Sequence, residues 1–547
     1  MTRWLGIVML VVTALVMTAG FTGEASPQLG TNPIAGSVSD TRGTRLNGVF
    51  VTAERAGATY RVTVFSDDGG QYRFPDLAAG TYTVMAHTGG FQTNRQSNIV
   101  VKSGATAEVG FTLAAETRPE ERFRQAVPGE WLTSLPGTEQ QKIAIGRNCS
   151  GCHHNLYQLM EHRFTREDWL KIVTTMEVTD AIGIVRPRGE VAENYVLERG
   201  QWRFGTREEI ADYLAQVQGP GSPLPNITFH PRPTGKATQA IITEYRIPRE
   251  GAAPHDVQVD REGNAWYNDF KANYLGKINP KTGEIKEFTM PGKPGTHPGS
   301  ANMGIYPDSP DHHVYVSLRT QGQMVKFDPI TEKIVVVWER SQMRTGLADM
   351  PFYRIDRNGI GLGGAGRVQL STGKVLTRTE YKGNTTGYAG DVDSKGVGYR
   401  GGIRDHDIKV LNPETGEVKS YPTPTPFSGP RRSEMDGDET LWFGEWWGGK
   451  IGTFDTQTTK ITEYTPSVPY AAFYQAGVNR STHEGWSFDW HNDRLVRVNP
   501  RTGELTEYPM PTRDVESRRT AVDNATNPPS VWIHGAGNGL IIRVQAP

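Results

Sequence analysis

The carboxyl-terminal part of the chain repeats one short phrase. NPKTGEIKEFTMP at residues 279–291 returns as NPETGEVKSYPTP from residue 412 and as NPRTGELTEYPMP from residue 499, with three degenerate copies between them. One threonine marks each copy, at spacings of 49, 41, 43, 43 and 44 residues: Thr282, Thr331, Thr372, Thr415, Thr458 and Thr502. This period, with its strand-turn-strand content, is typical of a β-propeller in which each repeat is one blade.

We expect seven blades between residues 240 and 547. The six copies account for six blades, and the irregular tail from residue 527 supplies a seventh. ITEYRIP at 242–248 has no inner strands before it, so we predict that it completes the last blade and closes the ring. Such closure removes an open sheet edge.

The propeller repeat resembles virginiamycin B lyase, through PHDVQVDREGNAWYNDFKANYLGKINP at 254–280 and LWFGEWWGGKIGTFD at 441–455. The resemblance implies opening of a cyclic depsipeptide by elimination, with a catalytic histidine and glutamate and a magnesium ion. Glu445 matches the glutamate, but Arg431 stands where the family has its histidine, 14 positions earlier. An arginine cannot act as a general base near neutral pH, so lyase activity is not expected. His255 and Asp269 keep the same separation in a different blade.

Other functional groups are expected where the innermost strands of a propeller meet its central channel. The alternative for each is a solvated loop or a hydrogen bond between blades. The mixture favours a pocket for a polar or anionic small molecule, and the candidates are His255, Asp256, Asp269, His297, Arg400, Arg404, His406, Arg431, Arg432, Glu434, Glu445, Trp446 and Trp447.

The only two cysteines of the chain lie in NCSGCHHN at residues 148–155. Cys-x-x-Cys-His is the attachment signature of c-type haem. Cys149 and Cys152 stand one helical turn apart, so both thiols can reach one edge of a haem, and His153 can bind the iron from the proximal side. A disulfide, thioredoxin-like chemistry or a metal site is the alternative, although two cysteines cannot close a four-ligand zinc site.

Short amphipathic helices are predicted around this motif. Thr138, Thr165 and Thr206 each suit a helix N-cap, and apolar residues follow two of them at helical spacing. Residues 130–220 resemble a class I cytochrome c domain. The resemblance favours a methionine as the second axial ligand of the iron, and Met176 is the candidate. Met160, His154 and His162 are rivals, and core packing is the alternative for Met176.

Residues 33–115 alternate apolar and polar residues in about seven short runs, which predicts an antiparallel β-sandwich. IAGSVSDTRGTRLNGVFV and SDDGGQYRFPDLAAGTYTV resemble the carboxypeptidase regulatory-like domain, which implies a transthyretin-like fold shared with some carbohydrate-binding modules. We expect a stabilising or docking module, with carbohydrate or cell-surface contact as the alternative. Residues 116–129 and 221–239 are expected to be linkers.

Residues 1–25 have one basic residue, an apolar run from Trp4 to Val16 and then small residues, which predicts a secretory signal peptide. An uncleaved anchor is the alternative. The mature chain is then expected to be periplasmic or secreted, without a transmembrane segment. The formal charge of -1 gives no indication of nucleic-acid binding.

The sequence therefore predicts a multidomain, mainly β protein with a sandwich, a small helical haem domain and a seven-bladed propeller. Haem attachment is its strongest chemical signal, so we expect single-electron transfer with one covalent haem c. The propeller would then bind a redox partner protein or a small-molecule substrate. A lyase with magnesium on the propeller and a binding or sensing module without catalysis are the alternatives.

Overall fold

The computed structural model describes residues 33–153, 156–178, 204–292, 304–307, 309–318, 321–343, 352–363, 365–385, 387–403 and 405–547. The side chains of residues 151–153, 177–178, 340 and 343 are outside this description. The predicted signal peptide also lies outside the described residues. Within them, every helix is too short to span a bilayer.

The amino-terminal domain is a β-sandwich, as predicted. One sheet has the order β4-β1-β7 with β8 also paired to β1, and the other contains β3-β2-β5-β6. Alternate residues of these strands face a common apolar core that includes Val38, Val51 and Val84, all fully buried. The strands are β1 (Ile34–Asp40), β2 (Phe50–Arg55), β3 (Tyr60–Phe65), β4 (Gln71–Arg73), β5 (Gly80–His87), β6 (Asn94–Val101), β7 (Ala107–Glu108) and β8 (Phe111–Leu113).

Short helices follow the sandwich. Three of them begin at the predicted caps: the backbone N–H of Gln141 donates to Thr138 Oγ1, and Thr165 and Thr206 accept in the same way. The helices are α1 (Pro119–Gln125), α2 (Pro128–Ser134), α3 (Glu139–His153), α4 (Tyr157–Glu161), α5 (Arg166–Val178), α7 (Arg207–Gln218) and the 3-10 helix η1 (Gly235–Gln239).

The two predicted linkers are more ordered than expected. Residues 116–129 contain α1 and the start of α2, because Pro119 and Pro128 sit at the first helical positions, where proline favours a helix. Residues 221–239 end in η1, and Phe229 of this segment packs against Gly89 and Gly90 of the sandwich.

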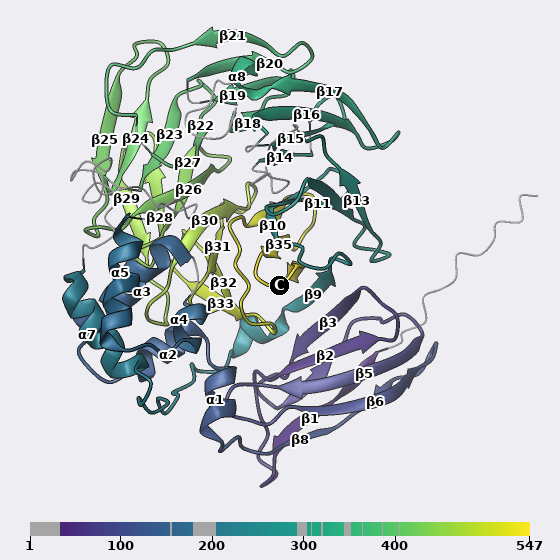
Figure 1. Ribbon diagram of the computed structural model, residues 1–547. Coiled ribbons are helices and arrows are strands. Elements are labelled where there is room, and N and C mark those ends of the chain that lie inside the picture. Colours follow the sequence, from purple (N-terminus) through teal and green to yellow (C-terminus); the bar gives the residue numbers. More distant parts are fainter. Residues whose placement is uncertain are drawn as a thin grey trace, which may run out of the picture.

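Seven four-stranded units surround a central channel, which confirms the predicted propeller (Figure 1). The first four blades are β10 (Pro254–Val259) to β13 (Ile285–Thr289), β14 (Ile305–Tyr306) to β17 (Lys333–Glu339), β18 (Arg354–Ile355) to β21 (Lys374–Arg378), and β22 (Gly390–Val392) to β25 (Val418–Pro422). Their middle strands are β11 (Ala265–Asp269), β12 (Tyr274–Ile278), β15 (Val314–Leu318), β16 (Gln323–Asp328), β19 (Ile360–Gly363), β20 (Gly366–Gln369), β23 (Gly398–Gly402) and β24 (Asp407–Leu411), and α8 (Arg340–Met343) follows β17.

The fifth and sixth blades are joined by one parallel bridge between Arg432 and Gln475 of their innermost strands. Blade five is β26 (Pro430–Met435), β27 (Thr440–Glu445), β28 (Lys450–Asp455) and β29 (Ile461–Tyr464). Blade six is β30 (Phe473–Val478), β31 (Gly485–Asp489), β32 (Arg494–Val498) and β33 (Leu505–Pro509).

The repeated phrase forms the turn between the two outer strands of a blade. Asn279 Oδ1 accepts from the backbone N–H groups of Lys281 and Thr282, and Gly283 then adopts a positive φ of 75°. The same turn recurs at Asn412 and Asn499. The asparagine and glycine of the repeat are therefore fixed by turn chemistry.

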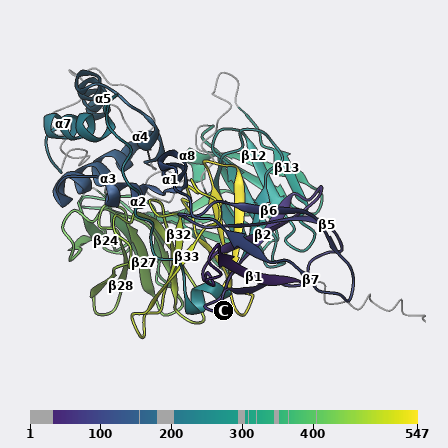
Figure 2. The same ribbon diagram turned by 90° about the horizontal axis from the view of Figure 1, so that it is seen from below.

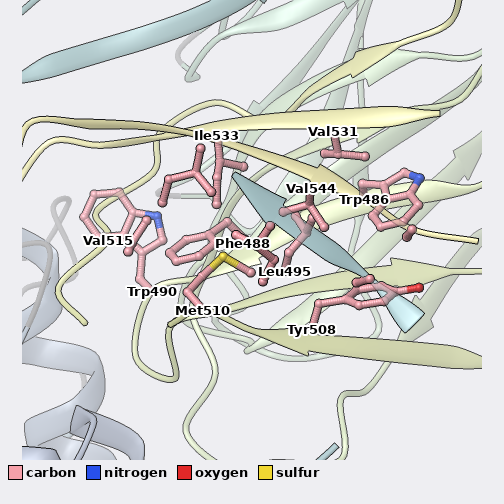
Figure 3. Close-up of a cluster of buried hydrophobic side chains, with 14 of the residues drawn as sticks. Trp486, Phe488, Trp490, Leu495, Tyr508, Met510, Val515, Val531, Ile533 and Val544 are labelled. Carbon is pink, nitrogen blue, oxygen red and sulfur yellow. The ribbon is translucent and has the colours of Figure 1, made fainter. Parts of the chain in front are cut away.

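The ring closes as predicted. β9 (Ile241–Arg246) pairs with the tail strand β36 (Leu540–Gln545), outside β35 (Ser530–Gly535) and β34 (Ala521–Asp523). Figure 3 shows how apolar side chains, among them Trp486, Trp490 and Ile533, fill the space between the sheets of blades six and seven.

The sandwich is attached to the propeller through the backbone. β3 pairs with the outer edge of β9, so blade seven continues into a sheet of the sandwich (Figure 1). Arg61 of β3 donates to Glu244 of β9 at 2.6 Å across this junction. An exposed edge strand would otherwise be a template for pairing with another chain, and β3 covers it.

Candidate functional site

The Cys-x-x-Cys-His motif forms the carboxyl-terminal end of α3. Cys149, Cys152 and His153 are three and four residues apart on a continuous helix, so they lie on one helical face. The side chain of Cys149 is half-buried and packs against the apolar cluster of the helical domain. The side chains of Cys152 and His153, and all of His154, lie outside the described residues.

That apolar cluster, which we call the helical core, joins α2 to α7. Trp131, Trp169 and Leu214 are among its most buried members. Hydrogen bonds fix the helices around it: Tyr213 Oη donates to the Pro136 carbonyl at 2.6 Å, and Asn148 Nδ2 donates to the Phe204 carbonyl at 3.0 Å. The last turns of α3 are therefore held against an apolar surface.

The candidates for the second axial ligand occupy different environments. Met160 is 2% exposed and belongs to the helical core, so core packing accounts for its position. Met176 is half-buried near the end of α5. His162 is exposed, with its ring 5.7 Å from that of Phe164.

The helical domain lies over one face of the propeller (Figure 2). Tyr470 Oη donates to Glu139 of α3 at 2.7 Å, and Tyr157 Oη of α4 donates to Asp493 at 2.6 Å. Beside these contacts, a cavity of about 300 Å³ lies between α3 and blades five and six, and Arg147 and Trp446 both line it. The Cys-x-x-Cys-His motif thus begins two residues beyond Arg147, which faces the propeller.

Arg431 lies under this interface in an aromatic box. Its guanidinium carbon is 4.2 Å from the ring centroid of Tyr474, 4.5 Å from that of Trp446 and 5.2 Å from that of Tyr388. Its Nε and Nη1 atoms are buried without a hydrogen-bond partner among the described residues. Cation–π contacts hold the charge in place of an ion pair.

Glu445 is fully buried beside the Glu463 carboxylate, which is paired with Lys450 at 2.7 Å. Burial, reinforced by the charge of Glu463, raises the pKa of Glu445 to about 9. Glu445 is therefore protonated at neutral pH and is not available as a general base. Since Arg431 cannot be one either, the two positions that match the lyase pair hold no general base at neutral pH.

A Glu445→Gln substitution is expected to stabilise the protein at pH 8 and to have little effect near pH 4. The native state keeps the proton that the unfolded chain loses above its ordinary pKa of 4.5. As the pH rises from about 4.5 to about 9, the free energy of unfolding of the native protein therefore falls by up to about 1.4 kcal/mol per pH unit. Denaturant titrations at both pH values test this.

Glu463→Gln is the control, and its expected effect on stability at pH 8 has the opposite sign. Hydrogen bonds from Lys450 and Thr425 outweigh burial and hold the pKa of Glu463 below its ordinary value, so its loss should destabilise at pH 8. If both substitutions changed the free energy of unfolding by the same amount at pH 4 and also at pH 8, a protonated Glu445 would be contradicted.

His255 and Asp269 have separate surroundings. Asp269 accepts hydrogen bonds from Arg249 and from the backbone N–H groups of Ala253, Lys271 and Ala272, which is a structural role. His255 is buried, with its ring stacked on Phe270 at 5.1 Å.

Asp256 forms a buried ion pair across the channel with Arg432 of blade five. His255 Nδ1 lies 3.4 Å from the carboxylate of Asp256, and Gly304 donates its backbone N–H to the same carboxylate at 2.8 Å. This pair connects the first and fifth blades at the centre of the ring.

The remaining channel candidates are mainly structural. Arg400 donates to the carbonyls of Thr385, Gly387 and Tyr388 and fixes that loop. His406 Nδ1 accepts from the backbone of Gly429, and its ring contacts that of Trp447 at 6.1 Å. His297 and Arg404 lie outside the described residues. Among the described residues, no three His, Cys, Asp or Glu side chains are grouped to hold a metal ion, so the magnesium site stays a prediction.

Sequence reasoning missed Tyr388, Tyr474 and Gln475. The repeat itself carried the signal. Gln475 of blade six pairs with Arg432 of blade five, so Tyr474, one residue earlier, is the blade-six equivalent of Arg431. Superposing the innermost strands of the copies would have found these residues.

One comparison with known proteins agrees with the predicted amino-terminal domain. Residues 33–114 match the family model of the carboxypeptidase regulatory-like domain. No curated protein sequence matches the chain. Solved structures that resemble it include a streptogramin B lyase (20% identity, TM-score 0.47, 57% of this chain and 100% of the other) and virginiamycin B lyase from Staphylococcus aureus (20% identity, TM-score 0.46, 56% of this chain and 100% of the other). The amino-terminal β-sandwich is thus similar to carboxypeptidase regulatory-like domains.

Proposed function

We propose that the protein is an exported c-type cytochrome that transfers single electrons at one face of a propeller. Cys149 and Cys152 would hold one haem through thioethers, and His153 would bind its iron. The observation that supports this most strongly is the position of the three residues on one face at the end of α3, with Cys149 packed on the helical core.

The backbone of α3 and the side chain of Cys149 suit this group. A haem c needs two thiols one turn apart, a neighbouring imidazole and an apolar surface that excludes water. α3 supplies the spacing, and the helical core supplies the surface beside Cys149. When bound, haem provides reversible one-electron oxidation and reduction. The residues of this chain orient it and limit its exposure to water.

The interface beneath α3 suggests where electrons would be exchanged. Arg147 of α3 and Trp446 of blade five line the same cavity, and Trp446 packs against Trp490 with ring centroids 5.2 Å apart. A redox partner protein or a small substrate bound at this face would lie close to the helix that bears the haem. We therefore assign the propeller the role of binding the electron donor or acceptor.

Replacing Met176 by alanine tests the axial ligand. The haem should stay attached, because the thiols and His153 remain, but the methionine-to-iron absorption band should disappear and the reduction potential should fall, since a thioether ligand raises it. Spectra and potentiometry of both proteins, produced in a host that matures c-type cytochromes, give the result.

Met160→Ala is the matched control. It should keep the absorption band while lowering the free energy of unfolding by about 2–5 kcal/mol, because Met160 is a core residue. If only Met160→Ala removes the band, the ligand assignment is wrong. A native protein that shows no haem bands in a reduced-minus-oxidised spectrum would refute the proposed function itself.

A further inference from the structure

The central channel contains a cavity of about 410 Å³ that is separate from the interface below α3. It is lined by the innermost strand of every blade: β10, β14, β18, β22, β26, β30 and β34. β26 begins at Pro430, next to Glu445 and the helical domain, and reaches this cavity with Arg432 and Glu434. The cavity therefore lies further along the channel than Arg431.

Three buried polar side chains in its wall have atoms that no described residue satisfies. Arg432 is 3% exposed, Gln475 4% and Ser433 8%. Arg432 Nε and Nη2, Ser433 Oγ and Gln475 Oε1 have no hydrogen-bond partner among the described residues. A buried polar atom without a partner costs about 1–3 kcal/mol, so a group of them beside a cavity indicates a ligand that satisfies them.

The charges of the wall favour an anion. Five arginines line the cavity against four carboxylates: Arg261, Arg354, Arg432, Arg480 and Arg519 against Asp260, Asp391, Glu434 and Asp523. The carboxylates in the wall are largely engaged by the protein itself: Asp391 accepts from the backbone N–H groups of Val392 and Met435, and Asp260 from Trp266 Nε1 at 2.7 Å. Burial raises the pKa of Glu434, although Arg480, 3.8 Å away, acts in the opposite direction.

We propose that this cavity binds a small hydroxycarboxylate. Guanidinium groups pair with carboxylates through two parallel hydrogen bonds. Gln475 and Glu434, on the same wall, can bond the hydroxyl groups of such a molecule. The volume falls within the usual range for small-molecule pockets, about 300–1,000 Å³, and far exceeds what an inorganic anion fills. The proposal extends the proposed function by naming the polar molecule that the propeller binds, and no haem ligand takes part in the site.

Calorimetric titration of the full-length protein tests the site with citrate and tartrate, and with inorganic phosphate and glucose for comparison, at constant ionic strength. Citrate or tartrate should bind saturably and raise the melting temperature. Arg480→Gln should weaken binding by about tenfold, the loss expected for one charged hydrogen bond. Arg480 is chosen because it is half-exposed and its replacement should not unfold the ring.

Arg501→Gln is the matched control, since it makes the same charge change at an exposed turn of blade six and should leave affinity unchanged. Absence of carboxylate binding, equal binding of phosphate, or equal effects of the two variants would overturn the proposal. The titration is repeated on the Cys149→Ala protein. If the native protein carries no haem but still binds carboxylates, this site is supported and only the proposed electron transfer is refuted.

Discussion

The Cys149→Ala variant is expected to lose stable attachment of haem. In the proposed haem site one of the two thioethers could not form, and with only the thiol of Cys152 left we expect little covalently bound haem. Because Cys149 is half-buried and alanine is smaller, the helical core should still form. The measurement is haem-dependent staining and intact mass after denaturation, which separate covalent from adsorbed haem.

Ser150→Ala is the control inside the same motif. It removes a hydroxyl that donates to the Arg147 carbonyl but leaves both thiols and His153, so attachment of one haem should persist. If the native chain is colourless after passage through a competent maturation system, with both thiols free to react, attachment does not occur. The proposed electron transfer would then have no redox centre.

Local sequence signals were sufficient for much of the fold. The threonine period predicted the blades because each copy encodes its own turn, with Asn279, Asn412 and Asn499 accepting from the same backbone positions. The closure by β9 was also predictable, since an outer strand without inner strands has one vacant place in the ring. Caps such as Thr206 work through residues three positions away and are equally local.

The arrangement between domains was not accessible in this way. β3 pairs with β9, and the contacting residues Arg61 and Glu244 are 183 positions apart in the sequence. The sequence of neither strand indicates its partner. The same holds for the site: Glu445 matched a catalytic position by spacing, yet burial, reinforced by the charge of Glu463 two strands away in the same blade, raises its pKa. The box around Arg431 gathers rings from three blades.

Arg432→Met is expected to lower the free energy of unfolding by about 3–5 kcal/mol, because it leaves the Asp256 carboxylate buried without its partner. Although burial acts in the opposite direction, the charge of Arg432 holds the pKa of Asp256 well below its usual range. The pair therefore contributes fully above the ordinary aspartate pKa, and its contribution is lost as the pH falls through the lower native value. Denaturant titration at pH 7 measures the loss.

The Asp256→Asn, Arg432→Met double variant separates the ion pair from simple packing. With neither charge of the pair left, it should recover part of the stability that the single variant loses, since removing one partner costs more than replacing both. Recovery would show that the unpaired carboxylate causes the loss. A double variant as unstable as the single one would instead attribute the loss to the contacts of the Arg432 side chain with Tyr474 and the Arg518 carbonyl.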